Sequence, residues 1–573
     1  MKIIKFLSVV AILSLFSACN KTPALKDGTF SGTGEGRNGP IEVEVTVTDG
    51  KITDAKITKE SETPEIALPA EEQIIRQFIE SGSTEEIDVV SGATITSNGI
   101  LDALDAATAL SQGKEQKAVV YHDTECDIVI VGAGGAGLVA ATEAASKGAR
   151  VIVLEKMGIV GGNANSSTGG INASYTKEQQ RLGIKDSPEV FYEDTMRGGK
   201  NMNDPVLVRT LVNNSASMVE WLQSPLIGAD LSDVGMFGGA TNKRIHRPQG
   251  GSAIGAHLIP LLHKAALEQG AQIRLNNKVV DILSDKAGTT ATGVRVSTEN
   301  GEYTILAKAV IIATGGFGAN AEMVEFYSAS LKGFGTTNHK GATGDAFAMV
   351  EKFNAELTQM EQIQIHPTVV KGTGAMITEA VRGNGAILVN KTGNRFINEM
   401  ETRDIVSAAI LKGPGKTACL VFDQSVRESL KAIEGYAKAG FLTEGASISE
   451  LAKKLSIPSD ALEATVATYN SFVQSKNDTD FGRNTASMER QLVKAPFYAI
   501  EIEPAIHHTM GGLKINEKAQ VLNKSGVAIP ALFAAGEVTG GVHGAERLGG
   551  NAVADFCIFG KIAADSALEF IKE

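Results

Sequence analysis

The chain is poor in cysteine, and its cysteines stand far apart. Cys126, Cys419 and Cys557 form no CxxC or CxxCH pair with each other or with the fourth cysteine, Cys19. Zinc sites, iron–sulfur clusters and covalent c-type haem need closely spaced ligands, so the sequence predicts no metal site and no haem. The odd number of cysteines beyond residue 19 also argues against a disulfide framework, and we expect three buried thiols.

An excess of basic residues is absent as well. The 573 residues include 54 lysines and arginines against 66 aspartates and glutamates, a net charge of −12. Nucleic acids are bound by basic faces, so this balance argues against a nucleic-acid partner. It leaves room for a small acidic substrate, because local arginines can reverse the field inside a cleft. The 43% hydrophobic content suits a large α/β protein, and the length predicts roughly three or four domains.

Long apolar runs are confined to the N-terminus. Lys2 and Lys5 precede the apolar stretch Phe6–Phe16, which is too short to span a bilayer and has the form of an export signal. The Ser-Ala-Cys sequence ending at Cys19 resembles a lipoprotein processing site, where the cysteine becomes the lipidated N-terminus. The third residue before it is aromatic where an aliphatic one is usual, so an ordinary signal peptide cut nearby is the alternative. We expect residues 1–19 to direct export to a periplasmic or cell-surface face, with a lipid anchor as the only membrane attachment.

Patterning divides the rest of the chain into segments. In residues 28–112, Val43–Val47 alternates apolar and polar residues, and a turn at Asp49-Gly50 leads into Lys51–Ile57, which is a hairpin signal. Helical patterns around residues 70–79 and 100–110 complete a predicted small α+β domain. The other predicted segments are a linker at 113–124, an α/β domain in two parts at 125–361 and 491–573, and an inserted domain at 362–490.

A strand, a glycine loop and a helix open the α/β domain. Ile128–Val131 is a continuous apolar strand, the loop Gly132–Gly137 has the form GxGxxG, and a second apolar strand, Val151–Leu154, ends at Glu155. This order predicts a parallel sheet. The same kind of strand returns at residues 309–314 and 531–535.

Each glycine of the loop has its own task in a dinucleotide site. Gly132 permits the tight turn, Gly134 lets the backbone approach a pyrophosphate at the helix N-terminus, and Gly137 allows close packing of helix on strand. Glu155 is placed to accept hydrogen bonds from a ribose. A lone GxGxxG is weak evidence, but here the strand, the helix and the acid all stand in the context that the motif requires.

Later glycine-containing segments favour FAD over NAD. They are Gly161–Ala164 with Ser167–Gly170 behind it, Ala313–Gly316, Gly536-Glu537 and Gly549–Ala552. The acid at position 537 can bind a ribitol hydroxyl. The last segment opens a helix whose positive end can face the flavin O2 and stabilise negative charge on the reduced ring.

Residues 125–573 resemble the flavoprotein subunits of the fumarate reductase and succinate dehydrogenase family. The resemblance is greatest to the soluble, periplasmic branch with flavocytochrome c fumarate reductases and urocanate reductases. It implies a Rossmann-like FAD-binding domain with an inserted α+β capping domain, non-covalent FAD, and an enzyme that reduces a C=C bond. The residues expected at the FAD are Gly132, Gly134, Gly135, Ala136, Gly137, Glu155, Asn163, Ala164, Gly169, Gly170, Val279, Thr314, Gly315, Asp345, His508, Glu537, Asn551, Ala552 and Val553.

A second flavin is implied by a motif in the N-terminal unit. The sequence from Asp88 to Thr94, DVVSGAT, resembles the flavinylation motif of FMN-binding domains. In those domains a flavin transferase links FMN to a threonine through a phosphoester, which needs an exposed hydroxyl on a loop beside small residues. The resemblance makes Thr94 the attachment residue, with Thr96 as the alternative.

The same resemblance implies a proton donor. Arg403, in the sequence Glu-Thr-Arg-Asp, matches the family's general acid, and Glu379 and Arg382 match the relay that restores its proton. An arginine is a poor acid in water, but it can act in a dry site beside another cation. If this stretch is helical, the three-residue spacing puts Glu379 and Arg382 on one face.

Two carboxylate clamps are also implied. His507 and Arg547 match the clamp on one carboxylate, and Arg547 can bind it through two parallel hydrogen bonds. The clamp on the other carboxylate is matched by His366, Thr378 and Glu379. The apolar positions that twist this carboxylate out of conjugation are matched by Met236, Phe237 and Met376.

Fumarate, reduced to succinate, is the expected substrate. Urocanate reductases carry a tyrosine where His366 stands and an aspartate near Glu379, whereas this chain has the fumarate-type pair. The alternatives are urocanate, acrylate, methacrylate or a cinnamate-type acid and, outside this class, an electron-transfer flavin lipoprotein. Electrons are expected from a membrane or periplasmic donor. NADH is not expected to be that donor, since the sequence has a single dinucleotide loop.

Overall fold

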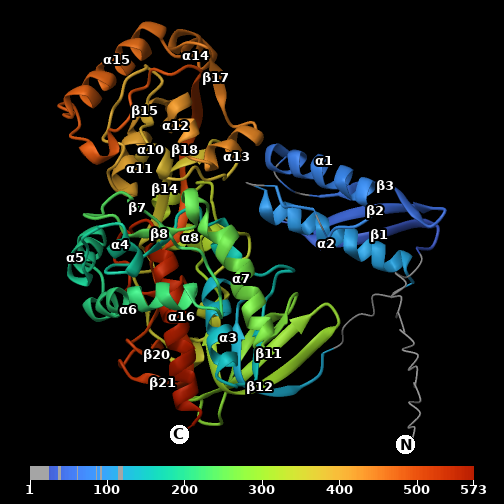
Figure 1. The fold of residues 1–573 in the computed structure, drawn as a ribbon. Coiled ribbons are helices and arrows are strands. Elements are labelled where there is room, and N and C mark those ends of the chain that lie inside the picture. Colours follow the sequence, from blue (N-terminus) through green and yellow to red (C-terminus); the bar gives the residue numbers. More distant parts are fainter. Residues whose placement is uncertain are drawn as a thin grey trace, which may run out of the picture.

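A computed structural model describes residues 25–36, 40–60, 62, 64–85, 87–90, 93–113 and 121–572. Figure 1 shows a small blue domain, a large central body and an orange upper body. The predicted export signal with Cys19, and most of the predicted linker, lie outside the described residues.

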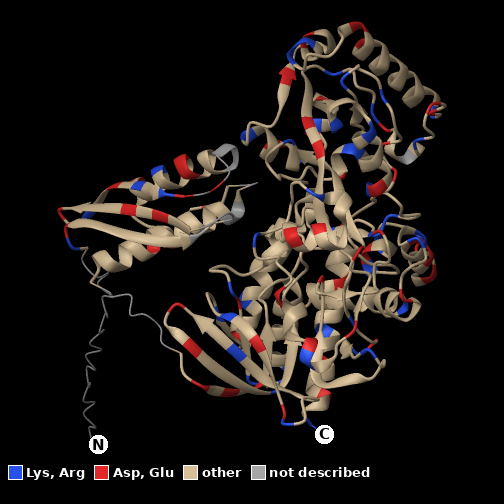
Figure 2. Ribbon diagram, turned by 180° about the vertical axis from the view of Figure 1, so that it is seen from behind, with Lys and Arg blue, Asp and Glu red and all other residues tan. Residues whose placement is uncertain are grey.

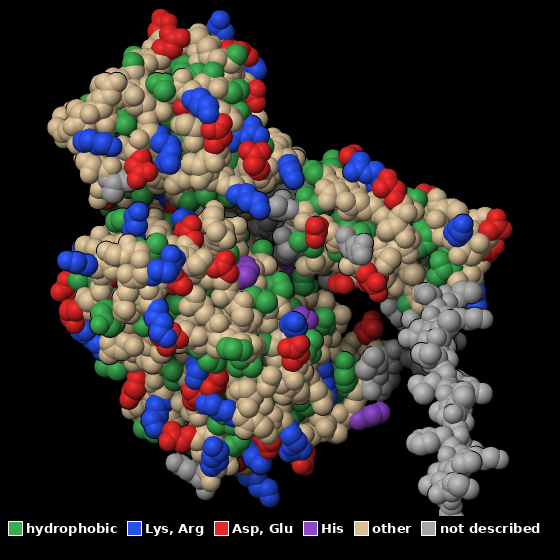
Figure 3. Space-filling model, in the orientation of Figure 1, with side chains coloured by type: hydrophobic (Ala, Val, Ile, Leu, Met, Phe, Trp, Pro, Cys, Tyr) green, Lys and Arg blue, Asp and Glu red, His purple; other side chains and the backbone are tan. Residues whose placement is uncertain are grey.

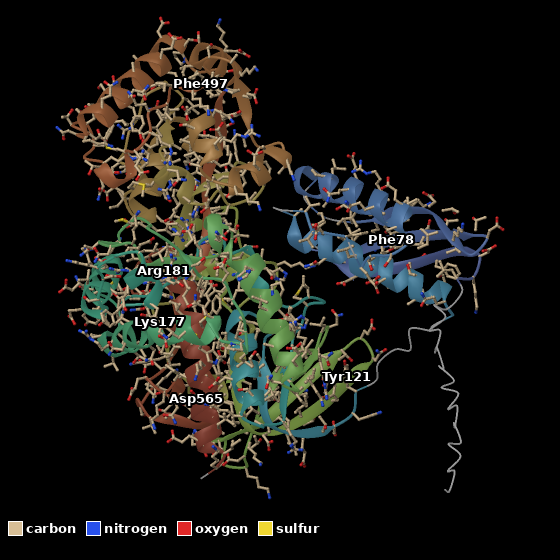
Figure 4. The ribbon with its side chains drawn as sticks, in the orientation of Figure 1. Phe78, Tyr121, Lys177, Arg181, Phe497 and Asp565 are labelled. Carbon is tan, nitrogen blue, oxygen red and sulfur yellow. The ribbon has the colours of Figure 1, made fainter. Side chains whose placement is uncertain are left out.

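The small domain is an antiparallel sheet packed against two helices. Val45 faces Ala55 across the predicted hairpin, and Asp49 and Gly50 both have positive φ, at 51° and 71°. That turn matches the right-handed twist of the flanking strands, so the hairpin is confirmed. Phe78 is buried in the core of this domain (Figure 4). Its elements are β1 (Gly28–Glu35), β2 (Pro40–Thr48), β3 (Lys51–Lys59), α1 (Pro64–Ser81) and α2 (Thr94–Ser111).

The central body is built on an eight-stranded sheet in the order β10-β11-β12-β4-β5-β9, with β21 beside β12 and β20 beside β21. Pairing is parallel between β4 and β5, between β12 and β4, and between β12 and β21. The predicted parallel sheet is therefore confirmed at all three places. The strands are β4 (Thr124–Val131), β5 (Val151–Leu154), β9 (Gln272–Arg274), β10 (Lys278–Ser284), β11 (Ala291–Thr298), β12 (Gly301–Ile312), β20 (Gln520–Leu522) and β21 (Ala528–Ala534).

Three helices pack in a row in this body: α7 (Ile254–Glu268), α3 (Gly135–Ser146) and α16 (Asn551–Phe570). The alanine-rich α3 is buried along almost its whole length, as its small side chains allow. Tyr121 stacks on Tyr303 of β12 where the chain enters the body (Figure 4). The remaining elements are α4 (Lys177–Arg181), α5 (Pro188–Gly198), α6 (Pro205–Gln223), α8 (Ala321–Tyr327), α9 (Asp345–Met349), β6 (Ile171–Asn172), β7 (Asp233–Gly235), β8 (Ile245–Arg247), β13 (Leu357–Thr358), β19 (Gly512–Lys514) and β22 (Thr539–Gly540).

The upper body, which we call the cap, is built on the sheet β14-β18-β16-β15, with β17 beside β18. Strands β14 and β18 are paired antiparallel, and together they extend from the cap to the central body. The cap strands are β14 (Ile363–Val370), β15 (Ile387–Val389), β16 (Ala418–Asp423), β17 (Thr443–Gly445) and β18 (Phe497–Thr509). Its helices are α10 (Ala380–Gly383), α11 (Arg403–Lys412), α12 (Gln424–Glu428), α13 (Ala432–Lys438), α14 (Ile448–Lys454) and α15 (Ser459–Ser475).

Charges of both signs are interspersed over all three bodies (Figure 2). Cys126, Cys419 and Cys557 are buried free thiols, as expected. Among the helices of the described residues, none is long and apolar enough to cross a membrane.

Candidate active site

A cavity of about 760 Å³ lies where the central body, the cap and the small domain meet. Nearly all the residues expected at the FAD line it, whereas Gly137 and Asn551 do not. The expected residues that line it are Gly132, Gly134, Gly135, Ala136, Glu155, Asn163, Ala164, Gly169, Gly170, Val279, Thr314, Gly315, Asp345, His508, Glu537, Ala552 and Val553. The proton-transfer and carboxylate-binding candidates on its wall are His366, Thr378, Glu379, Arg403, His507 and Arg547.

The glycine loop is shaped for a pyrophosphate. Gly132 has a φ of 104°, and a Cβ on Gly137 would lie 1.9 Å from the Gly132 carbonyl oxygen, so neither position accepts a side chain. A Cβ on Gly134 would meet nothing closer than 3.9 Å, which leaves the backbone open to the cavity. Helix α3 begins at the next residue and directs its N–H groups towards this opening.

Glu155 holds the loop from behind. One carboxylate oxygen accepts a hydrogen bond from the Ala133 N–H and the other from the Met157 N–H, both at 2.9 Å. Burial raises the pKa of this carboxyl. Its position at the end of β5 agrees with the sequence prediction, and the structure adds its contact with the glycine loop.

The flavin end of the cavity has polar groups that suit FAD. The Thr314 hydroxyl is buried with no hydrogen-bond partner within the described part of the chain. Glu537 accepts hydrogen bonds from the Thr509 N–H at 3.1 Å and from the Asn163 amide at 3.3 Å. Gly550, with a φ of 89°, turns the chain into α16, as predicted. Bound FAD would supply hydride chemistry at its N5 atom.

Asn551 packs behind this wall. Its side chain accepts a hydrogen bond from Asn172 at 2.7 Å and donates one to Thr195 at 3.2 Å. It therefore fixes the first turn of α16, while Ala552 and Val553 line the cavity.

Arg403 is joined to the predicted relay. Its Nε donates to a carboxylate oxygen of Glu379, and Arg382 lies 3.9 Å from the same oxygen. Glu379 and Arg382 share one face of a short helical turn that includes α10, as the spacing predicts. Although burial works in the opposite direction, the charges of Arg403 and Arg382 hold the pKa of Glu379 below its ordinary value. The carboxyl is therefore ionised between two guanidinium groups.

Gln364 joins Arg403 to Arg547, a role that the sequence analysis missed. We call the part of the cavity around Glu379, Arg403 and Arg547 the reaction site. Its carbonyl oxygen accepts from Arg403 at 2.9 Å and from Arg547 at 3.0 Å. Its amide nitrogen donates to Glu546 and, at 2.8 Å, to the Arg547 carbonyl oxygen. Burial lowers the pKa of Arg547 to about 9 and raises that of Glu546 to about 7. The available signal was position: Gln364 and His366 are buried alternate residues of β14.

The rings of the two predicted clamp histidines, His366 and His507, are in edge contact, with centroids 5.0 Å apart. Burial, and then the neighbouring Arg403, hold the pKa of His366 and of His507 well below its ordinary value. The Thr368 N–H donates to His366 Nδ1 at 3.3 Å, so the neutral ring carries its proton on Nε2. His507 Nδ1 lies 2.7 Å from the Thr337 hydroxyl.

The reaction site has an excess of positive charge. Three buried arginines, Arg382, Arg403 and Arg547, stand around one carboxylate with a lowered pKa, Glu379. Phe237 and Met376 supply apolar wall, whereas Met236 does not line the cavity. A pocket of this kind suits a small anion with more than one negative charge.

A second buried ion cluster lies behind the first, inside the cap. Arg395 donates to both carboxylate oxygens of Glu399 and to Asp478, each at 2.9 Å. Arg483 reaches Glu399 at 3.1 Å. The two clusters touch where Arg382 donates to the Glu399 carbonyl oxygen at 2.6 Å.

Comparison with known proteins identifies the family. A model of the FAD binding domain matches residues 127–553, and a model of the FMN-binding domain matches residues 36–109. The chain belongs to the FAD binding domain family. It is an FAD-dependent oxidoreductase that carries an FMN-binding domain before its FAD-binding domain, which confirms the fold and both flavins expected from the sequence.

Relatives of this oxidoreductase include several reductases of unsaturated acids. It is 48% identical over 470 residues to a fumarate reductase (cytochrome) of Shewanella frigidimarina, covering 82% of this chain and 81% of the relative. An NADH:fumarate oxidoreductase of Klebsiella pneumoniae is 42% identical over 95% of this chain and 58% of its own length. A urocanate reductase of Eggerthella lenta is 34% identical over 94% of this chain and 92% of its own.

A solved structure shares the fold. It is the open conformation of a flavocytochrome c3 fumarate reductase, 40% identical with a TM-score of 0.67 over 86% of each chain. The resemblance to the fumarate reductase family drawn from the sequence is confirmed.

Proposed function

We propose that this oxidoreductase reduces the C=C bond of fumarate to give succinate. The observation that carries the proposal is that two buried arginines, Arg403 and Arg547, line the cavity. The neutral His366 and Thr378 line the same cavity. A dicarboxylate can place one carboxylate at Arg547 and the other at His366 and Thr378. Relatives named for fumarate reduction, at 48% and 42% identity, support the same substrate.

Different side chains would bind the two carboxylates of the substrate. Arg547 binds one carboxylate, and the Nε2–H of His366 donates to the other. Phe237 and Met376 press on that second carboxylate and turn it out of the plane of the double bond. The surrounding positive charge stabilises the carbanion-like transition state as hydride adds to one carbon.

Arg403 would deliver the proton to the other carbon. Its contact with Glu379, and the second guanidinium of Arg382 beyond, form a path by which the lost proton is replaced.

The test is oxidation of a reduced viologen dye with fumarate, urocanate and acrylate side by side. We expect fumarate to be the best substrate by kcat/KM. Urocanate is the second candidate because of the Eggerthella lenta relative. The His366→Tyr variant tests it by introducing the residue usual in urocanate reductases. Faster turnover of urocanate or acrylate by the unaltered protein would refute the fumarate assignment.

We also propose Thr94 as the FMN attachment residue. The alternative, Thr96, is only 2% exposed, and its hydroxyl donates to a carboxylate oxygen of Glu62. That hydroxyl is therefore poorly placed for a flavin transferase. Thr94→Ala should abolish the flavin fluorescence that stays with the denatured chain, while Thr96→Ser should keep it; fluorescence retained in Thr94→Ala would exclude Thr94.

Export and anchoring complete the proposal. The N-terminal pattern supports export as a lipoprotein with Cys19 as its lipidated residue, and export implies a membrane or periplasmic electron donor. The separate sheet β14-β18-β16-β15 supports a capping domain at residues 362–490. Cys19→Ser should move the protein from the detergent phase to the aqueous phase in Triton X-114 partitioning. A wild-type protein already in the aqueous phase would contradict lipidation.

A further inference from the structure

The cavity of the reaction site extends along the cap to the small domain. Ala93, which precedes α2, and Thr96, in the first turn of α2, line the same cavity as His366 and Thr378. The buried apolar side chains of the small domain and of the cap belong to one continuous cluster, so the two bodies are packed together (Figure 1). We call the boundary between α2 and α13 the seam.

The cap contributes one helix to the seam. Lys431, Tyr436 and Phe441, on α13 and its flanks, line the cavity opposite the start of α2. Ala432, Gly435 and Ala439 also line it. These three residues have small side chains or none. The Tyr436 hydroxyl accepts a hydrogen bond from the Thr378 N–H at 3.0 Å, which fixes this side chain in the cavity wall.

The charges at the seam suit an anion. Lys431 is exposed and has no ion-pair partner among the described residues. Its neighbour Glu434 is instead bonded to Arg427 at 2.7 Å. Across the seam, Ala93 gives the N-terminus of the 18-residue helix α2 no side-chain cap. Cationic side chains lie on the cap where it meets the small domain in Figure 3. A phosphate between α2 and Lys431 would meet positive charge from both sides.

We propose that α13 forms the cap half of the FMN site. The FMN on Thr94 lies in the seam, with Lys431 at its phosphate and with Tyr436 and Phe441 against its ring. This rests on the proposed attachment at Thr94. It assigns to the cap a part in binding a cofactor that is carried by another domain.

Phosphorus NMR of the holoprotein tests the phosphate contact. The phosphoester of FMN gives one signal, separate from the pair given by the pyrophosphate of FAD. Lys431→Gln should shift the phosphoester signal and leave the FAD pair unchanged. Lys438→Gln is the matched control, because Lys438 is an exposed lysine of the same helix that does not line the cavity. A phosphoester signal unchanged by Lys431→Gln overturns the assignment of Lys431.

Iodide quenching of FMN fluorescence tests the ring contact, with Thr94→Ala protein giving the FAD background. Phe441→Ala should make the FMN several-fold easier to quench. Phe326→Ala is the control, since Phe326 is an aromatic residue that is 80% exposed on α8 and absent from the cavity wall. Equal quenching of wild type and Phe441→Ala overturns the ring contact.

The two proposals fail in different ways. If the wild-type chain carries no FMN at Thr94, both the attachment and the α13 site are wrong. If FMN is present but neither variant alters its signals, only the α13 site is wrong. Fumarate turnover by enzyme whose FAD is reduced directly with dithionite does not depend on either result, so it reports on the reductase activity alone.

Discussion

Two buried arginine–carboxylate clusters lie next to each other in this protein, and they differ in charge balance. In the cap, Arg395 and Arg483 meet Glu399 and Asp478, so each positive charge has a negative partner. In the reaction site, three arginines surround Glu379. Both clusters are buried and hydrogen-bonded, so burial alone does not reveal which one binds a ligand. The excess of one sign does, since an unbalanced buried charge is costly until a counter-ion arrives.

The largest expected effect is the loss of turnover when the cluster with excess positive charge, around Glu379, loses an arginine. Arg403→Ala removes the proposed acid and should lower kcat for fumarate by about 10³-fold, within the range for general acid catalysis. The variant should keep its FAD and its thermal midpoint, because Glu379 keeps Arg382 as a partner. Viologen oxidation and the flavin absorbance spectrum measure both. Turnover within tenfold of wild type would remove Arg403 from the mechanism.

A change in the balanced cluster should act on stability. Arg395→Ala leaves Glu399 and Asp478 short of a partner, and breaking a buried ion pair costs about 3–5 kcal/mol. We expect a lower thermal midpoint, with kcat per bound FAD close to wild type. If Arg395→Ala instead matched Arg403→Ala, with normal stability and lost turnover, the distinction between the clusters would be wrong.

Substrate binding should respond to the shape of the cation at position 547. Arg547→Lys keeps the charge but loses the planar fork that holds a carboxylate through two hydrogen bonds. We expect KM for fumarate to rise about 10–100-fold, since lost charged hydrogen bonds are worth about 1.5–3 kcal/mol. Malonate, a saturated dicarboxylate, should raise the thermal midpoint of wild type more than that of the variant. Unchanged KM would place the carboxylate elsewhere.

The smallest effect concerns Glu546, the carboxyl next to the unbalanced cluster. Its pKa is raised to about 7 by burial, so the folded protein holds this proton more tightly than the unfolded chain does. Stability from this group is therefore present at low pH and is lost as the pH rises from about 4.3 to about 7.

Glu546→Gln removes that titration. The stability of the variant relative to wild type should therefore increase between pH 5 and pH 8, by roughly 2–3 kcal/mol. Thermal midpoints across this pH range give the comparison. A constant difference between the two proteins at every pH would show that Glu546 does not titrate there.

The sequence predicted most of what local chemistry determines. The hairpin of the small domain, the strand–loop–helix at Gly132–Gly137 and the start of α16 all follow from short patterns with a physical cause. The resemblance to a known family also predicted which ionisable residues belong to the candidate site. They come together from β14, α10, α11, β18 and the loop before α16.

What the sequence missed depends on packing between distant segments. Gln364 carries no charge, and its role depends on its position between Arg403 and Arg547. Those two arginines are 144 positions apart in the chain. Tyr436 contacts the Thr378 backbone only because the cap folds α13 against that loop. Asn551 was expected at the cofactor but serves the start of α16, since nothing in a glycine-rich turn says which way its amide faces.

The long strand β18 joins the sheet of the cap to the candidate active site without a break. It begins at Phe497 among the cap strands, where Figure 4 labels it, and ends at Thr509 just beyond His507 and His508. Its partner β14 carries His366 and is bonded to it along most of its length. Because His366 and His507 lie on these two paired strands, a tilt of the cap away from the central body would move both side chains together relative to Arg547. The same motion would then weaken the binding of the product and open the cavity for its release.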